Sequence, residues 1–472
     1  MNINFYRERV VILNNVAIAE DVKKLQNERT ENIRAVYDNL IPKRVPISVS
    51  IGLDIVAEYA GIDRREALWE PLLLETAADE LCERIFSDVC VYGGKIHMPS
   101  YYQSMGSKNC IMSSTGFMQH PNTVGLFAEE YDEFIKNPFD CIVEKVLPRN
   151  YKELDFKEKP ARSMFTIAQA MMAKNKNFAK TAGMIKRLTE KYGYPVNEPG
   201  TGGGVYAPMD ILSDNLRSFS GMSSDIRRMP GKVKDAVEAI YPLNYKVGMP
   251  PKITNYGNVF FPLHMPTFMR EKDFAKLWWP MWFRQVNDYA SKGLHSRAFC
   301  EHDWMRYLDY IQELPTDTRI QFEYGDAKTI KKKLGNKFIL TGLFPLSTLT
   351  TCTRQQCIDK TKEFIDIMAP GGKFIFGFEK SALVLSDIHI ENLIAVCETV
   401  RDYGIYDNPG EKAGLQFNKE DYKHSEIVPF ESKYYRTFEE YKEQNPETPE
   451  MAKDAVMELE DAIVSFIYGL CQ

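Results

Sequence analysis

The chain has 472 residues, of which 44 % are hydrophobic and 26 % are charged, the ordinary balance of a folded globular protein. This length suits one large barrel with extensions or two to three average domains. The formal net charge of −6 argues against a general nucleic-acid binder, which normally carries a basic face.

The cysteine pattern and the hydropathy predict a cytoplasmic protein. Nine cysteines are scattered without a CxxC pair, and an odd number in a long chain makes a secreted disulfide framework a poor match. The first fifteen residues carry charges at 7–9 and contain no apolar run of signal-peptide length. No segment approaches the roughly 18 consecutive apolar residues that span a bilayer, so we expect no membrane contact.

The first half of the chain alternates between predicted helices and strands. A polar amphipathic helix over 17–40 stops before Pro42, since the residue before a proline is pushed out of helical geometry. Residues 44–52 are a strand candidate followed by helical spacing, and 64–87 is helical. Further predicted elements are a strand at 87–93, a loop-rich segment at 94–125, a helix at 127–149 interrupted near Pro138, and a long helix at 160–193.

Residues 194–210 contain four glycines, at 200 and 202–204. They either form a backbone cradle or mobile loop over a site, or they make a connection that needs positive φ. The GxxxxGK[ST] and GxGxxG spacings are absent, which disfavours nucleotide binding. The segment 210–240 is predicted to be helical on both sides of a turn near 221.

Four short apolar runs between 258 and 380 each end in polar residues, many of them able to bind a metal or a proton. They reach His264, the Cys300–Asp303 stretch, Glu323 with Asp326, and Glu379. Strands alternating with helices, with chemistry at the strand exits, are typical of a (β/α)₈ TIM barrel, an α/β fold. We therefore predict an N-terminal helical extension over 1–42 and a barrel over 43–472, closed by a helix after a polar connection in the last forty residues.

Several short motifs, in order and spacing, resemble the uroporphyrinogen decarboxylase superfamily over roughly residues 40–405. They are RVPI (44–47), IFSDV (85–89), MQHPNTVGLFAEEYD (118–132), APMDILSDNLR (207–217), FPLHMP (261–266), GLFP (342–345) and PGGKFIF…IEN (370–392). The resemblance implies the (β/α)₈ barrel and one of two chemistries. One is decarboxylation of porphyrinogen acetates without a cofactor. The other is methyl transfer among small substrates, cobalamin proteins and thiol or folate acceptors, usually with zinc.

Part of the sequence motif that accompanies decarboxylation in the family is absent from this chain. After R-x-P-V the family pattern continues with arginines that grip propionates, whereas here Arg44-Val45-Pro46-Ile47 is followed by SVSIGLD. Losing these charge-assisted clamps removes roughly 1.5–3 kcal/mol each. Asp88 does match the pyrrole-binding aspartate of the family, which keeps a decarboxylase acting through Asp88 as the alternative.

Thiol methylation is also disfavoured, because Phe322-Glu323-Tyr324 stands where those relatives have H-x-C, and 378–382 lacks their cysteine. What remains resembles enzymes that remove a methyl group from a methoxylated aromatic and pass it to the Co(I) centre of a separate corrinoid protein. Asp387 and His389 begin a D-x-H pattern, but Asn392 replaces its glycine. We therefore expect cobalamin to be carried by the partner protein. The resemblance also allows a homodimer.

Cleavage of an aryl methyl ether needs help for the leaving phenolate, whose conjugate acid has a pKa of about 10. A Lewis acid or a proton donor beside the ether oxygen would stabilise the developing charge. Zinc is the expected metal, because it takes histidine and carboxylate ligands and keeps one position open in catalytic sites. The candidate ligands are His264, Glu301, His302 and Glu323.

Glu301, Glu323 and Asp88 are the candidate catalytic residues, and His264, Phe322, Tyr324 and Asp303 are the candidate substrate-binding residues. Because Cys300 precedes Glu301 on an extended strand, the two must point to opposite faces. Two simpler interpretations stay open, a backbone-bonded His264 and a Glu323 paired with a lysine. A third function class, a non-catalytic binder of a tetrapyrrole or of a corrinoid protein, also stays open.

Overall fold

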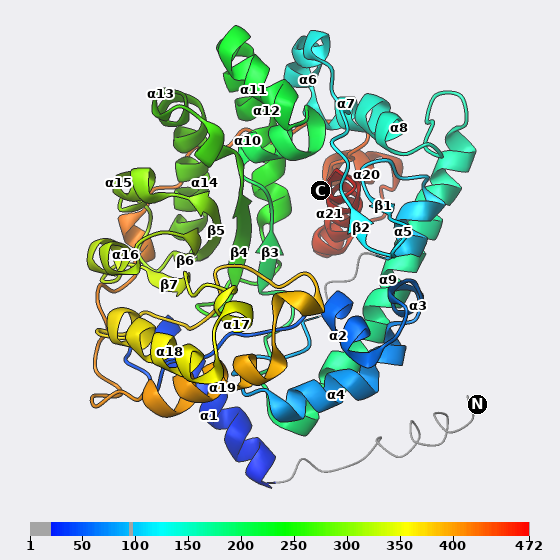
Figure 1. Cartoon of the computed structure of the whole chain (residues 1–472). Helices are drawn as coiled ribbons and strands as arrows, with labels where there is room; N and C mark the ends of the chain where they lie inside the picture. Colours follow the sequence, from blue (N-terminus) through cyan, green and yellow to red (C-terminus); the bar gives the residue numbers. More distant parts are fainter. Residues whose placement is uncertain (1–19, 94–97, 472) are drawn as a thin grey trace, which may run out of the picture.

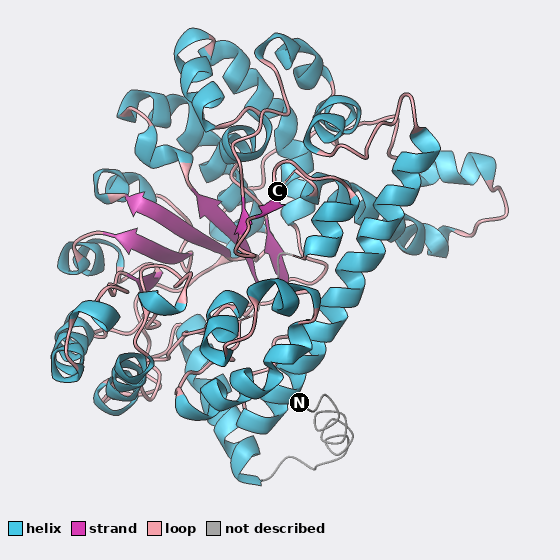
Figure 2. Cartoon of the chain, turned by 45° about the vertical axis from the view of Figure 1, so that its right-hand side comes forward, coloured by secondary structure: helices cyan, strands magenta, loops and turns pink. Residues whose placement is uncertain are grey.

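A computed structural model describes residues 20–93 and 98–471 and shows a mixed α/β fold built on a five-stranded parallel sheet. The strand order is β3-β4-β5-β6-β7, which is also the order along the chain. Helices surround the strands in both views (Figures 1 and 2). The strands are β3 (Gly202–Gly204), β4 (Asn258–Leu263), β5 (Ser296–Asp303), β6 (Arg319–Tyr324) and β7 (Ile339–Gly342).

Three extended segments continue the sheet beyond β7 through isolated parallel bridges. Leu340 of β7 pairs with Phe374, Phe376 pairs with Ile47, and Ile51 pairs with Tyr92. Backbone hydrogen bonds support each step, such as Ile375 N–H to the Leu340 carbonyl at 3.1 Å. The predicted strands at 44–52, 87–93 and 372–380 are therefore extended and paired, although only isolated bridges connect them to their neighbours.

The α-helices confirm most of the predicted helical segments. The predicted 17–40 helix is α1, whose first three predicted residues lie outside the described part, and the long 160–193 helix is α9. The helices are α1 (Glu20–Tyr37), α2 (Leu53–Ala60), α3 (Arg64–Trp69), α4 (Glu75–Arg84), α5 (Pro99–Ser104), α6 (Tyr131–Lys136), α7 (Pro138–Cys141), α8 (Leu147–Asn150), α9 (Pro160–Tyr192), α10 (Pro208–Asp210), α11 (Phe219–Arg228), α12 (Pro230–Gly248), α13 (Glu271–Asp273), α14 (Trp279–Ser291), α15 (Leu308–Ile311), α16 (Ala327–Leu334), α17 (Thr348–Thr351), α18 (Arg354–Met368), α19 (Ile390–Tyr403), α20 (Phe438–Gln444) and α21 (Lys453–Gly469).

The N-terminal helix α1 is tied to the end of α9. The Arg29 guanidinium donates to the backbone carbonyls of Tyr192 and Gly193, and the Gln26 amide donates to the Tyr194 carbonyl at 2.8 Å. Its other anchor is apolar, since Val36 is fully buried. Helix α1, which lies within the predicted extension, thus packs on the rest of the described chain.

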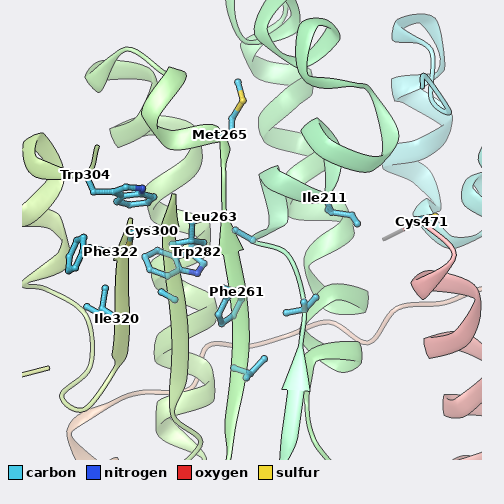
Figure 3. Close-up of a cluster of buried hydrophobic side chains, with 14 of the residues drawn as sticks. Ile211, Phe261, Leu263, Met265, Trp282, Cys300, Trp304, Ile320, Phe322 and Cys471 are labelled. Carbon is cyan, nitrogen blue, oxygen red and sulfur yellow. The ribbon is translucent and has the colours of Figure 1, made fainter. Parts of the chain in front are cut away.

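The two faces of the sheet differ in what covers them. Phe261, Leu263, Cys300 and Phe322 are all buried, and they point from β4, β5 and β6 toward the helical layer, where Trp282 of α14 lies (Figure 3). Their neighbours along each strand are less buried, so the burial of β4 alternates strictly. One face therefore forms the hydrophobic core, and the other face, which carries Glu301, borders open space.

Three local features differ from the predictions. The glycine-rich segment contains β3, the edge strand of the sheet, and only Gly200 of its four glycines has a positive φ. The helix break predicted near 221 lies at Arg217–Ser218, where Ser218 has φ +68° and its side chain accepts a hydrogen bond from the Gly221 N–H. The short hairpin of β1 (Ile111–Met112) and β2 (Met118–Gln119) lies in the segment predicted as loop.

None of the helices in the described residues is both long enough and apolar enough to cross a membrane.

Close packing explains the glycine at position 203, which leads to a first prediction. A Cβ atom there would lie 2.3 Å from the backbone oxygen of Gly248 at the end of α12, while a Cβ at Gly202 would meet nothing within 4 Å. We expect Gly203→Ala to lower the free energy of unfolding by about 1–3 kcal/mol because the backbone must shift. The matched control Gly202→Ala should change it far less in the same urea titration, and equal effects would contradict this packing argument.

Candidate functional site

The candidate site lies where β4, β5 and β6 end, at the carboxyl edge of the sheet. Phe299 of β5 is in register with Gln321 of β6, so Glu301 and Glu323 each lie two residues further along the same face. His264 directly follows β4. Parallel pairing therefore brings together three residues that lie far apart in the sequence, at the neighbouring strand ends where they are predicted to lie.

His264 is held between two carboxylates. Its Nδ1 lies 2.6 Å from Asp214 Oδ2, and its Nε2 lies 2.7 Å from Glu301 Oε2. Asp214 belongs to the π-helical segment η5 (Ile211–Leu216), which follows α10. Both ring nitrogens thus face acceptors, and only the doubly protonated imidazolium can donate to both.

The pKa values of the site follow from this contact. Burial alone would lower the pKa of His264, but the hydrogen bonds to Asp214 and Glu301 outweigh burial and raise it to about 10. Burial alone would raise the pKa of Glu301, but the hydrogen bond and charge of His264 hold it below its usual value. At neutral pH the pair is an imidazolium against a carboxylate.

A buried aspartate, Asp210, binds the backbone of His264. Its Oδ2 accepts from the His264 backbone N–H at 3.2 Å, and its Oδ1 accepts from Trp278 Nε1 at 2.8 Å. It is fully buried, and burial together with the charge of Asp214 raises its pKa to about 8. Asp210 and Asp214 are not among the site residues predicted from the sequence. Their four-residue spacing on one helical face within APMDILSDNLR was the available signal.

His302 sits at an irregular point of β5. The ladder between β5 and β6 shifts between Cys300 and Asp303, and His302 has φ +61°, which is unusual outside glycine. Its backbone N–H donates to Glu323 Oε2 at 2.7 Å. The ring packs edge-on against Phe268 at 5.2 Å, with Nε2 3.8 Å from Glu301 Oε1 and Nδ1 3.9 Å from Glu323 Oε2. The bulge therefore turns His302 toward both glutamates.

Glu323 forms an ion pair with a lysine, which is the simpler of the two interpretations of this residue. Lys380 Nζ lies 3.3 Å from Glu323 Oε1, on the segment that follows Phe378. Tyr324, the next residue, is 63 % exposed, and Asp303 is exposed and accepts from the Met305 N–H. These two predicted substrate-binding residues lie at the rim of the site.

Two predicted site residues lie elsewhere. Phe322 is fully buried and points to the helical face, so it belongs to the core and does not face the site. Asp88 is also fully buried, and both of its oxygens accept from the Arg44 guanidinium at 2.7 Å. The Ile47 N–H donates to it as well. The structure therefore places Asp88 in an ion pair near the beginning of the 44–51 segment, apart from the Glu301 cluster.

A cavity of about 930 Å³ borders the open face of the sheet. Arg297, Gln321 and Thr341 line it from β5, β6 and β7, and Lys380 lines it beside the cluster. Helix α1 contributes to one end, and α9 contributes to a side wall. The cavity is large enough for a small organic molecule, and Lys380, which pairs with Glu323, is where its lining comes near the acid–base residues.

The expected zinc ligands have suitable chemistry but do not converge in this structure. Imidazole and carboxylate groups are normal zinc donors, and a carboxylate such as Asp214 behind a histidine is a usual supporting contact. Among residues 20–93 and 98–471, however, no three or more His, Cys, Asp or Glu side chains are placed to hold one ion. His264 with Glu301 comes nearest, and Glu301 occupies the Nε2 position that a metal would need.

Comparison with known proteins gives no further assignment, since no protein-family model and no curated protein matches the chain.

The raised pKa of His264 predicts a pH-dependent stability. Its pKa rises from 6.5 to about 10 on folding, so the stabilisation is complete below pH 6.5 and is lost as the pH rises toward 10. Because 34 % of the side chain is exposed, solvent screening limits the effect to about 1–2 kcal/mol. The unfolding free energy of the parent should therefore exceed that of His264→Gln by more at pH 6 than at pH 10. A difference that does not depend on pH would contradict the assignment.

Proposed function

We propose that the five-stranded sheet and the segments 374–378, 44–51 and 88–93 form a (β/α)₈ barrel with an N-terminal helical extension. The parallel bridges, which run continuously from β3 to Tyr92, support the proposal. The helices outside and the cavity-bordered face inside also support it. In such barrels the chemistry sits at the carboxyl ends of the strands, where His264, Glu301 and Glu323 lie.

We propose that the protein is a methyltransferase that takes the methyl group from a small methoxylated aromatic and passes it to a separate corrinoid protein. The observation that carries the proposal is the imidazolium of His264 between Asp214 and Glu301, at the carboxyl edge of a sheet whose open face borders a cavity. A phenol has a pKa of about 10, close to that of His264. A proton can therefore pass to the leaving oxygen at little cost.

The residues act as follows. The substrate oxygen displaces Glu301 Oε2 from His264 Nε2 and accepts the Nε2–H hydrogen bond in its place, while Glu301 stays beside the ring as its counter-charge. The electron pair of the O–CH₃ bond stays on oxygen, the methyl group passes to the nucleophile on the partner protein, and the Nε2 proton joins the oxygen to give the phenol. Asp214 keeps the ring in place through Nδ1, and water returns the proton. A Co(I) corrinoid on the partner supplies the two-electron nucleophile.

Zinc held by His264 and Glu301 would supply Lewis-acid polarisation of the same oxygen in place of the proton. Metal analysis of the parent and of the His264→Gln and Glu301→Gln variants separates the two routes. About one zinc per chain, lost in both variants, supports the metal route. Full activity of a parent that contains no metal supports the acid route.

The decarboxylase alternative loses support from the position of Asp88. A catalytic aspartate must reach its substrate, whereas Asp88 is fully buried and its oxygens are taken by Arg44 and the Ile47 N–H. Freeing it would break a buried ion pair, which costs about 3–5 kcal/mol.

We expect His264→Gln to lower the rate of methyl transfer from 4-methoxybenzoate to a Co(I) corrinoid protein by about 10²–10⁴-fold, the usual contribution of a general acid. The transfer can be followed by the absorbance change of the corrinoid. His424→Gln is a matched control, because His424 is exposed and its hydrogen-bond partner within the described residues is the Tyr245 hydroxyl. An unchanged rate in His264→Gln would refute the acid role.

A better leaving group should rescue the variant if protonation is what it lacks. 4-Nitroanisole releases a more acidic phenol than anisole, so it needs less help from an acid. The parent-to-variant rate ratio should therefore be smaller for 4-nitroanisole than for anisole. Equal ratios would mean that His264 acts in substrate positioning and not in proton transfer.

A further inference from the structure

The cavity is electropositive although the chain as a whole is acidic. Five basic residues line it, against a single acidic residue, Glu198, in a chain of net charge −6. Glu198 itself lies 3.0 Å from Lys252. The other lining residues are apolar or neutral and polar, and a cavity whose charged residues are mostly basic favours an anionic ligand.

Most of the basic residues in the cavity already have partners. The Arg319 guanidinium donates to the carbonyls of Asn255 at 2.8 Å and Tyr256 at 3.2 Å, and it lies 3.7 Å from the Tyr37 ring centre. Lys380 pairs with Glu323, and Lys186 pairs with Glu190 at 3.7 Å. Arg34 is exposed on α1 and stacks on Tyr256 at 4.4 Å. These four cations therefore already have partners within the protein.

Arg297 is different. Within the described part of the chain no carboxylate lies within 4.0 Å of it, and its hydrogen bond is a long one, Nη2 to Gln321 Oε1 at 3.4 Å. Its guanidinium lies 5.4 Å from the Phe260 ring centre. Water can reach it through the cavity, yet the surrounding walls desolvate it enough to lower its pKa. A guanidinium that faces a cavity and pairs with no carboxylate of the described residues is available to bind an anionic ligand.

The position of Arg297 relative to the acid–base residues sets the size of the ligand. Arg297 and Glu301 lie four residues apart on the same face of β5, which separates their Cα atoms by about 13 Å. Gln321, which the guanidinium reaches, is in register with Phe299, two residues nearer the cluster. The side chain therefore leans toward His264 and Glu301, and the remaining gap suits one aromatic ring.

We propose that the cavity binds an aromatic monocarboxylate whose carboxylate is clamped by the Arg297 guanidinium. The aromatic ring of the ligand then lies beside Phe299 and Gln321. The substituent opposite the carboxylate points to His264 and Glu301. The identity of that substituent as a methoxy group rests on the proposed function. The carboxylate clamp does not rest on it, because the clamp depends only on Arg297 and the cavity.

The test is direct binding by calorimetry, with no corrinoid protein present. The probes are 4-methoxybenzoate and its neutral isostere 4-methoxybenzamide. The parent should bind the carboxylate about 10- to 100-fold more tightly than the amide, the range expected for one charge-assisted bidentate contact. Arg297→Gln should remove that preference. Arg297→Lys should retain only part of it, because an ammonium lacks the planar fork.

The matched control is Arg354→Gln, which removes an exposed charge at the start of α18, outside the cavity lining. It should leave both affinities unchanged. Arg297→Gln breaks no ion pair among the described residues. Its thermal midpoint should therefore not fall below that of the parent, and measuring this midpoint checks that the variant is folded.

Equal binding of the carboxylate and the amide by the parent would overturn the clamp, as would no binding of the carboxylate at all. Undiminished carboxylate binding by a folded Arg297→Gln would do the same. Binding with the predicted preference but without methyl transfer would leave the clamp standing and reject only the proposed function.

Discussion

The hydrogen bonds that His264 makes with Asp214 and Glu301 are the interaction on which the rest of the site depends. They join the π-helical segment η5 to the ends of β4 and β5, and they fix the ring in two directions. They also reverse the usual effect of burial, because two carboxylates raise the pKa of a half-buried imidazole to about 10. A histidine that would otherwise be neutral near pH 7 is therefore protonated at that pH and can act as a proton donor.

The face of the sheet that borders the cavity is where a substrate would meet this proton donor. Each strand puts one side of its alternation into the helical core, as Phe261, Cys300 and Phe322 do (Figure 3). The other side faces the cavity, as Arg297 and Gln321 do. Along β5 the open side carries Arg297, Phe299 and Glu301 in turn. One strand therefore presents a cation, an aromatic ring and an acid–base group in the order in which a small aromatic anion would meet them.

The sequence allowed the central strands to be predicted because β4, β5 and β6 have clear apolar alternation with polar residues at their ends. The same pattern identified His264, Glu301 and Glu323, and the opposite directions of Cys300 and Glu301 follow from strand geometry alone. The segments at 44–52 and 372–380 are also predicted as strands, and their isolated parallel bridges bear this out in part.

Other features depend on tertiary contacts that no local pattern records. Asp214 and Asp210 lie in a helical segment whose direction toward His264 is set by the packing of Trp278. Asp88 matched a motif position, but its partner Arg44 encloses it. The role of Gly203 needs the backbone of Gly248 from a different helix. In each case the deciding neighbour is distant in sequence.

The most direct test of the account is the protonation state of His264, measured by nitrogen-15 NMR of histidine-labelled protein, with His264→Gln used to assign the signals. The account predicts that both ring nitrogens of His264 carry protons at pH 8 and that the ring loses one of them only as the pH approaches about 10. A single protonated nitrogen at pH 8, with a transition near pH 6.5, would contradict it and remove the proton donor from the proposed reaction.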